Sequence, residues 1–170
     1  HSVTRPRFSV VINTLNRAQS LGRTLDSLRW QRYGGGFEVI VVNGPSTDGT
    51  QALVDAMAGR IRAGRCEVAN LSVSRNIGIA MASGDVVAFI DDDAIPEPEW
   101  LEQLADAYED PAVGAAGGFV FDPSGVGFQC RYCVVDRLGN PDFTPQAPSP
   151  LLCFPGSFRF PHLMGTNASF

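Results

Sequence analysis

The feature that most constrains the fold is a run of five apolar residues, 86–90, that leads directly into three consecutive carboxylates, Asp91, Asp92 and Asp93. Continuous apolar runs with β-branched residues are typical of strands buried on both faces of a parallel sheet. In open α/β sheets, ligands bind just outside the carboxyl ends of such strands. Three adjacent carboxylates repel one another, and Mg²⁺ or Mn²⁺, which binds carboxylates together with substrate phosphates and water, would relieve that repulsion. The sequence therefore predicts a metal–diphosphate site here, with a polar turn ahead of Pro96 as the alternative.

Strand-like segments recur along the first 121 residues and alternate with segments in which apolar residues have helical spacing. We expect strands at residues 8–12, 37–42, 67–71, 86–90 and 113–121. A helix should follow each of the first four strands, the first at residues 18–32 and the third capped by Ser72 or Ser74, with residues 59–65 as a linker. This alternation predicts an α/β fold with a mainly parallel sheet flanked by helices.

Length and charge limit the classes to which the chain can belong. Its 170 residues suffice for one domain with a hydrophobic core. We expect an α/β core at residues 1–122 and a loop-rich region of the same domain at residues 123–170. The net charge of −5, without a basic run, argues against a nucleic-acid polymer as partner. No apolar stretch is long enough to span a bilayer, and the lack of lysine excludes lysine-based nucleophilic or P-loop chemistry within the chain.

The sequence contains four cysteines, Cys66, Cys130, Cys133 and Cys153. A structural zinc site would need a second pair of ligands beside Cys130 and Cys133, and only Cys153 and His162 are available, at irregular spacing. We therefore interpret the cysteines as reduced, structurally incidental thiols. We expect a cytoplasmic protein, in which any association with a membrane would come from regions outside this chain.

Polar turns follow the expected strands, and a parallel sheet would bring these turns to one edge. Several of their residues also have structural explanations. Asn16 is a good helix N-cap, Asp48 favours a helix N-terminus, and Asn43 precedes a Gly-Pro pair as a turn residue would. Arg75 would stand in the first turn of its helix, where a bound phosphate would offset the unfavourable helix dipole; the alternative is an arginine that faces solvent.

Four motifs in this order resemble glycosyltransferase family 2. They are residues 10–17 (VVINTLNR), 41–50 (VVNGPSTDGT), 74–78 (SRNIG) and 89–93 (FIDDD). Residues 165–170 (GTNASF) are similar to the segment before the family's acceptor region. The resemblance implies a GT-A fold, incomplete at its C-terminal end, and a nucleotide-diphosphate sugar as donor. The family's catalytic base, in a Glu-Asp-type motif, would lie beyond Phe170.

The resemblance also implies roles for residues of the first two loops. Thr14, Asn16 and Arg17 would line the base pocket. Asn43 would replace the family's common Asp that contacts the base, and Asp48 would be a further contact.

The remaining roles implied by the resemblance concern the phosphates and the metal. Arg75 would approach the diphosphate, with Asn76 shaping the turn around it. Asp91-Asp92-Asp93 would be the D-x-D motif, in which Asp92 faces the ribose. Asp93 would bind the divalent metal, Mn²⁺ or Mg²⁺, with support from Asp91.

These expectations describe an inverting glycosyltransferase that moves a sugar, with a UDP-sugar favoured, to an unknown acceptor, which could be a glycan, a lipid or a small molecule. A carboxylate base would deprotonate the acceptor hydroxyl while the metal stabilises the departing diphosphate. Because the base motif would lie outside the chain, we expect donor binding with little or no transfer. Two alternatives stay open: a nucleotidyltransferase, which would want a Gly-rich, Arg- or Lys-bearing loop after the first strand, and a non-catalytic nucleotide-binding domain.

Overall fold

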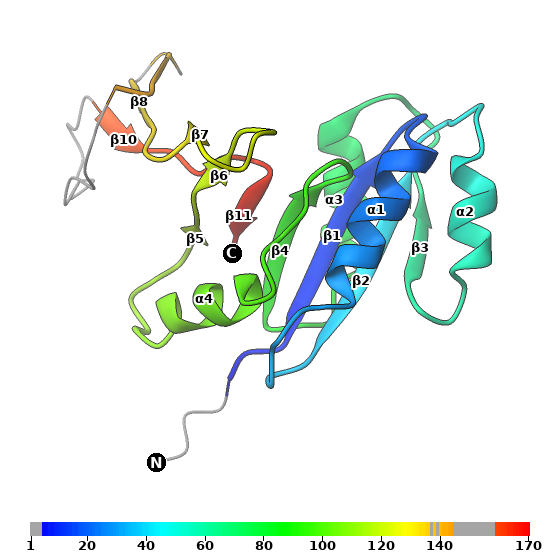
Figure 1. Ribbon diagram of the computed structural model, residues 1–170, viewed down its shortest axis with the longest axis horizontal. Helices are drawn as coiled ribbons and strands as arrows, with labels where there is room; N and C mark the ends of the chain where they lie inside the picture. The colour runs from blue at the N-terminus through cyan, green and yellow to red at the C-terminus, as the bar shows by residue number, and fades with distance from the viewer. Residues whose placement is uncertain (1–4, 137, 139, 145–158) are drawn as a thin grey trace.

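A six-stranded sheet with the order β3-β2-β1-β4-β11-β5 forms the centre of the protein in the computed structural model (Figure 1). The structure describes residues 5–136, 138, 140–144 and 159–170. The strands of the central sheet are β1 (Phe8–Thr14), β2 (Phe37–Asn43), β3 (Arg62–Arg65), β4 (Val86–Asp91), β5 (Ala116–Gly117) and β11 (Asn167–Ser169).

The first four of these strands by position in the chain run parallel to one another. β1 lies between β2 and β4, and its register places Thr14 beside Asn43 and Asn13 beside Asp91. β3 pairs in parallel with β2. The carboxyl ends of these strands therefore meet at one edge, which we call the carboxyl rim: Asn13, Thr14, Asn43 and Asp91, with the loops that follow them. The expected α/β fold with a mainly parallel sheet is confirmed.

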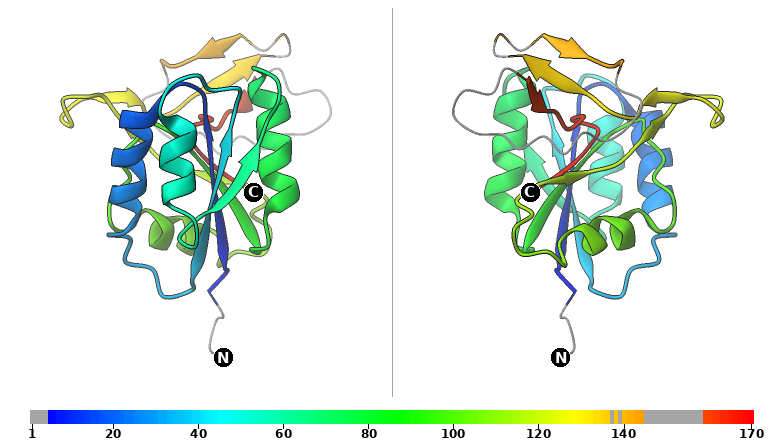
Figure 2. Two further views of the ribbon diagram at one scale, coloured as in Figure 1. Left: turned by 90° about the vertical axis from the view of Figure 1, so that its right-hand side faces the viewer. Right: turned by 90° about the vertical axis from the view of Figure 1, so that its left-hand side faces the viewer.

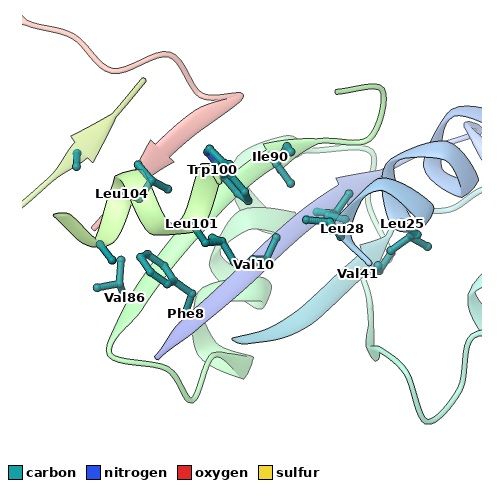
Figure 3. Packing of buried hydrophobic residues seen from close by; sticks show 14 of the residues in the cluster. Phe8, Val10, Leu25, Leu28, Val41, Val86, Ile90, Trp100, Leu101 and Leu104 are labelled. Carbon is teal, nitrogen blue, oxygen red and sulfur yellow. The ribbon is translucent and has the colours of Figure 1, made fainter. Parts of the chain in front are cut away.

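Helices cover both faces of the sheet (Figure 2). Helices α1 (Ala18–Leu28), α2 (Thr50–Ala56) and α4 (Trp100–Ala107) cover one face, and α3 (Leu71–Met81) covers the other. Figure 3 shows the larger core, in which the inward side chains of β1, β2 and β4 meet those of α1 and α4. In α1, Leu21, Leu25 and Leu28 recur at helical spacing and all are buried, which explains why this segment is an amphipathic helix.

Close backbone packing holds α3 against the sheet. A Cβ on Gly78 would lie 2.4 Å from a methyl carbon of Val11 in β1, so only glycine fits between helix and strand. Asn70 is the N-cap of this helix, and its side chain accepts a hydrogen bond from the amide of Val73 at 3.1 Å. The prediction that Ser72 or Ser74 caps this helix was wrong, because Asn70 precedes both and caps it first.

A partly buried carboxylate ties the end of α3 to the opposite, amino edge of the sheet. Glu38 accepts hydrogen bonds from the hydroxyl of Ser9 at 2.7 Å, the amide of Ser83 at 2.8 Å and the guanidinium of Arg62 at 2.9 Å. Burial opposes the ionisation of Glu38, but these hydrogen bonds outweigh burial and lower its pKa from 4.5 to about 2. The connection is therefore strongest with the carboxylate ionised.

Three other expected boundaries differ from the structure. The third strand is β3, within the expected linker, and not residues 67–71. β3 lies at the edge of the sheet with mostly exposed residues, so it carries no apolar run. Residues 113–121 form two short strands, β5 and β6 (Val120–Phe121), since Gly117 and Gly118 pack tightly against Asn167 between them. The first helix ends at Leu28 and not at residue 32.

The C-terminal region adds two small sheets and returns to the central one. β6 pairs with β7 (Phe128–Cys130) as a hairpin, and β8 (Val134–Asp136) pairs with β9 (Pro141–Asp142) and β10 (Arg159–Pro161). β11 then runs antiparallel between β4 and β5. Residues 123–170 thus contribute a strand to the central sheet, while their separation from a core at 1–122 stays a prediction. None of the helices among the described residues is long and apolar enough to cross a membrane.

Candidate functional site at the carboxyl rim

The three consecutive carboxylates at the end of β4 occupy three different environments. Asp91 is exposed, Asp92 is only 8% exposed, and the side chain of Asp93 is half exposed. The hydroxyl of Thr14 donates to Asp92 at 2.6 Å, and Arg17 forms an ion pair with Asp93 at 2.8 Å. Burial is the main reason that the pKa of Asp92 is raised, against the hydrogen bond from Thr14. Asp92 is thus held in place, while Asp91 and Asp93 are exposed on either side of it and Asp93 is paired with Arg17.

The loops after β1 and β2 interlock beside this triplet. The backbone amide of Asn16 donates to the hydroxyl of Ser46 at 2.9 Å, and the side-chain oxygen of Asn16 accepts from the amide of Thr47 at 2.7 Å. Asn16 is in the left-handed region with φ of 56°, which asparagine tolerates better than most residues. Asn16 therefore shapes the rim. It does not cap α1, whose first flanking residue is Arg17 with no side-chain cap.

Asn43 and Asp48 also serve this loop structure. Asn43 is 2% exposed, donates to Gln51 at 2.8 Å and accepts from the hydroxyl of Ser46 at 2.7 Å. Asp48 accepts from the amides of Thr50 at 2.9 Å and Ala18 at 3.3 Å, and the hydroxyl of Thr50 is the main reason for its lowered pKa. Asp48 therefore lies at a helix N-terminus, as its structural explanation predicts: its carboxylate joins the starts of α1 and α2.

Arg75 lies in the second turn of α3 and not in the first, because the helix begins at Leu71. Its guanidinium stacks over the ring of Phe89 at 5.3 Å and donates to the carbonyl of Gly165 at 3.2 Å. Its Nε is buried and has no hydrogen-bond partner within the described part of the chain. Asn76 lies beside Arg75 in the same helix and does not shape a turn.

Arg75 and Asn76 line a cavity of about 300 Å³ between α3, β4 and the segment around β11, together with Ser72, Phe89, Gly165 and Phe170. No ion pair joins Arg75 to the aspartate triplet among the described residues. The structure therefore brings Thr14, Asn16, Arg17, Asn43 and Asp48 together around the Asp92–Asp93 side of the rim. Arg75 and Asn76 lie on the α3 face. A larger groove of about 790 Å³ lies away from the rim, at the amino end of β2 between α1 and α2.

The residues at the rim can be tested for their fit to a divalent cation. Asp91 and Asp93 present hard carboxylate oxygens to solvent, the donor type that Mg²⁺ and Mn²⁺ prefer. Among the described residues, however, no group of three or more His, Cys, Asp or Glu side chains is arranged to hold a metal. The rim therefore fits a cation that takes one or two protein carboxylates and receives its other ligands from a substrate diphosphate and water.

Sequence reasoning missed the residues that support this arrangement. Ser46 joins Asn16 to Asn43, Gln51 holds the buried amide of Asn43, and Ser74 accepts from the side chain of Asn13 at 2.6 Å. Ser46 lies within a loop of turn formers, so its hydroxyl could have been proposed from the sequence as a hydrogen-bonding group of this loop. The pairing of Ser74 with Asn13 depends on how α3 packs on β1, which no local pattern encodes. Cys66, Cys130 and Cys133 are buried free thiols, and Cys153 lies outside the described residues.

The fold and the rim define an α/β protein that places carboxylates and an arginine where a phosphorylated ligand would bind. A family model described as "Glycosyl transferase family 2" matches residues 9–160. The chain therefore belongs to glycosyl transferase family 2, as the four motifs predicted.

Individual relatives agree with this family. The chain is 38% identical over 119 residues to a glucosyl-dolichyl phosphate glucuronosyltransferase of Haloferax volcanii, a match that covers 67% of this chain and 38% of the relative. Its fold is similar to that of a mannosyltransferase of Pyrobaculum calidifontis in complex with GDP-Man and Mn²⁺, with a TM-score of 0.59, 30% identity and coverage of 72% of this chain and 37% of the other.

A second solved structure shares the fold. It is the glucosyl-3-phosphoglycerate synthase of Mycobacterium tuberculosis in complex with Mn²⁺, UDP and phosphoglyceric acid, with a TM-score of 0.58, 25% identity and coverage of 70% of this chain and 45% of the other. The predicted GT-A fold is confirmed. The chain spans less than half the length of each of these three proteins.

Proposed function

We propose that this chain is the donor-binding core of an inverting glycosyltransferase that uses a nucleotide-diphosphate sugar, with a UDP-sugar favoured, and Mn²⁺ or Mg²⁺. The observation that carries the proposal is the different environment of each carboxylate in the aspartate triplet. Asp92 is buried and fixed by Thr14, while Asp91 and Asp93 flank it at the surface of the rim.

The ion pair between Arg17 and Asp93 supports a site that exchanges one cation for another. Both side chains are about half exposed, and exposed ion pairs contribute only about 0–1 kcal/mol. A divalent cation can therefore displace Arg17 from Asp93 at little cost, which releases the guanidinium to contact the donor. In this proposal Asp93, with Asp91, would hold the cation, which when bound neutralises the charge that develops on the departing diphosphate.

The other rim residues would position the nucleotide. Thr14, Asn16 and Arg17 would surround the base, Asn43 and Asp48 would hold the second loop in the required shape, and Asp92 would face the ribose. Arg75 would contact the diphosphate together with Asn76, which lines the same cavity; the buried Nε of Arg75 has no hydrogen-bond partner in the described part of the chain.

The proposal leaves the acceptor unassigned and expects the catalytic base outside this chain, so transfer by the 170 residues alone should be weak or undetectable. It includes a cytoplasmic location, which the free thiols of Cys66, Cys130 and Cys133 support because cytosolic thiols stay reduced.

Calorimetric titration with UDP and GDP, each with and without Mn²⁺, tests the proposal. Metal-dependent binding of at least one nucleotide should weaken about ten-fold or more in Asp93→Asn, because one charged ligand is lost. Asp26→Asn, at an exposed carboxylate of α1 away from the rim, is the matched control and should bind as the unsubstituted chain does. Absence of binding of both nucleotides, or equal loss in both variants, would contradict the proposal.

A further inference from the structure

A cluster of aromatic side chains surrounds one arginine on the surface of the β6–β7 hairpin. We call it the aromatic patch: Phe119, Phe121, Phe128, Arg131 and Tyr132. The guanidinium of Arg131 lies 4.7 Å from the ring centroid of Phe128, 5.4 Å from that of Phe119 and 5.7 Å from that of Tyr132. Phe128 contacts Phe119 edge-on and stacks with Phe121, yet each of the three phenylalanines remains 42–45% exposed.

Arg131 has no carboxylate partner among the described residues, although the chain as a whole is acidic. Aromatic faces hold its planar guanidinium by cation–π attraction and restrict its rotamers, so it would lose little entropy when it binds an anion. A guanidinium covered on its faces still has its edge N–H groups for bidentate contacts, which match a phosphate. The acidic side chain nearest in sequence on the hairpin, Asp122, is occupied by the hydroxyl and amide of Ser124.

Three other apolar side chains of the C-terminal region are also exposed. Val126, at the tip of the hairpin, is 85% exposed, and Leu138 and Phe143 are 87% and 52% exposed. Phenylalanine has no polar group, so the exposed faces of the patch's three phenylalanines beside Arg131 offer apolar contact alone and suit a hydrocarbon chain better than a polar partner.

Asn167 of β11 lies between the patch and β4, the strand that ends at the carboxyl rim. The side chain of Asn167 donates to the carbonyl of Phe119 at 3.4 Å and accepts from the indole of Trp100 at 2.9 Å. In β11, Asn167 lies opposite Ile90, the residue directly before Asp91. Figure 1 shows the β6–β7 hairpin at the same end of the molecule as the carboxyl ends of β1 and β4.

We propose that the aromatic patch binds a phosphate-bearing amphiphile, with the phosphate on the edge of Arg131 and the hydrocarbon chain across Phe121 and Phe128. A single unpaired cation within an apolar surface fits one headgroup and its tail. It does not fit general adsorption to an anionic membrane, which needs several cations. That this amphiphile is the acceptor rests on the proposed function, whereas its binding does not.

Titration calorimetry with octyl phosphate, kept below the concentration at which it forms micelles, tests the proposal. Octyl phosphate should bind at least ten-fold more tightly than inorganic phosphate or octyl glucoside, because only octyl phosphate carries both groups. Arg131→Gln should weaken its binding about ten-fold or more, and Arg131→Lys by an intermediate factor, since the charge remains but the planar fork is lost. Phe121→Ser should weaken the binding of octyl phosphate about five-fold, because it removes apolar contact.

Arg23→Gln is the matched control, because Arg23 is an exposed arginine of α1 without an ion pair among the described residues. Equal binding by Arg131→Gln and Arg23→Gln, in variants that unfold at the same temperature as the unsubstituted chain, would overturn the proposal. Displacement of octyl phosphate by UDP would place it in the donor site and also overturn it. Concentration-dependent dimers that Phe121→Ser abolishes would assign the patch to a second copy of the chain instead. If UDP fails to bind while octyl phosphate binding depends on Arg131, only the proposed function fails.

Discussion

Replacing Thr14 with valine removes the hydroxyl that, among the described residues, donates to the buried carboxylate of Asp92. The two groups are 2.6 Å apart, and Thr14 and Asp92 are only 5% and 8% exposed, so water cannot easily take the place of the hydroxyl. Valine keeps the shape and the strand preference of threonine. The substitution therefore tests the hydrogen bond with little change in packing.

The expected loss follows from the charge of the acceptor. Hydrogen bonds to charged groups contribute about 1.5–3 kcal/mol, roughly twice the value for neutral pairs. We expect Thr14→Val to lower the free energy of unfolding by about 2 kcal/mol at pH 7, which would shift a urea midpoint by roughly 1 M. Equilibrium unfolding in urea, followed by circular dichroism, measures this loss.

Thr24→Val is the matched control. Thr24 is also fully buried and donates at 2.9 Å, but its acceptor is the neutral backbone carbonyl of Ala94. This variant should lose about 1 kcal/mol. A loss in Thr14→Val that is equal to or smaller than the loss in Thr24→Val would refute the claim that Thr14 stabilises an ionised Asp92.

Three further substitutions test the contacts that begin α3 and hold it against the sheet. The pKa of Glu38 is about 2 in the folded chain and 4.5 in the unfolded chain, so the chain should lose up to about 3 kcal/mol of stability as the pH falls from 4.5 toward 2. Glu38→Gln has no carboxylate to protonate and should not show this loss. An acid transition in thermal melts that is the same with and without the substitution would contradict the prediction. Gly78→Ala should lower stability by about 1–3 kcal/mol by overpacking against β1, whereas Gly114→Ala, which enters open space, should change little; similar losses in urea unfolding would argue against the close contact. Asn70→Ala should lower the free energy of unfolding by about 1 kcal/mol because the N-cap is lost, and Ser72→Ala should change it very little. A larger loss in Ser72→Ala than in Asn70→Ala, measured by thermal unfolding, would show that the serine caps the helix.

The parts of the fold that the sequence predicts are those in which local pattern and burial coincide. Residues 8–12, 37–42 and 86–90 are largely apolar, with Ser9 and Glu38 as the polar exceptions, because β1, β2 and β4 are covered on both faces. Their parallel order then places Asp91 and the loops after Thr14 and Asn43 at one edge. The position of the candidate site therefore follows from the strands alone.

The parts that the sequence does not predict depend on long-range packing. β3 is an exposed edge strand and therefore lacks an apolar run. β11 begins at Asn167, 76 positions after Asp91, and pairs with β4 through a long-range contact that no local pattern encodes. Asn16 looks like an N-cap until its left-handed backbone and its contact with Thr47 are known. The stacking around Arg131 likewise requires the β6–β7 hairpin to bring separate aromatic residues together.

Paramagnetic broadening by Mn²⁺ tests the central claim most directly, because it locates the cation on the chain. With UDP present, Mn²⁺ should first broaden the backbone amide resonances of residues 14–17 and 91–94, and should leave residues 59–62, in the groove at the far end of β2, sharp. Without UDP, broadening at the rim should require much higher Mn²⁺ concentrations, because the described residues offer no cluster of three metal ligands. Broadening that centres on residues 59–62, or that is as strong without UDP as with it, would contradict a metal–nucleotide site at the carboxyl rim.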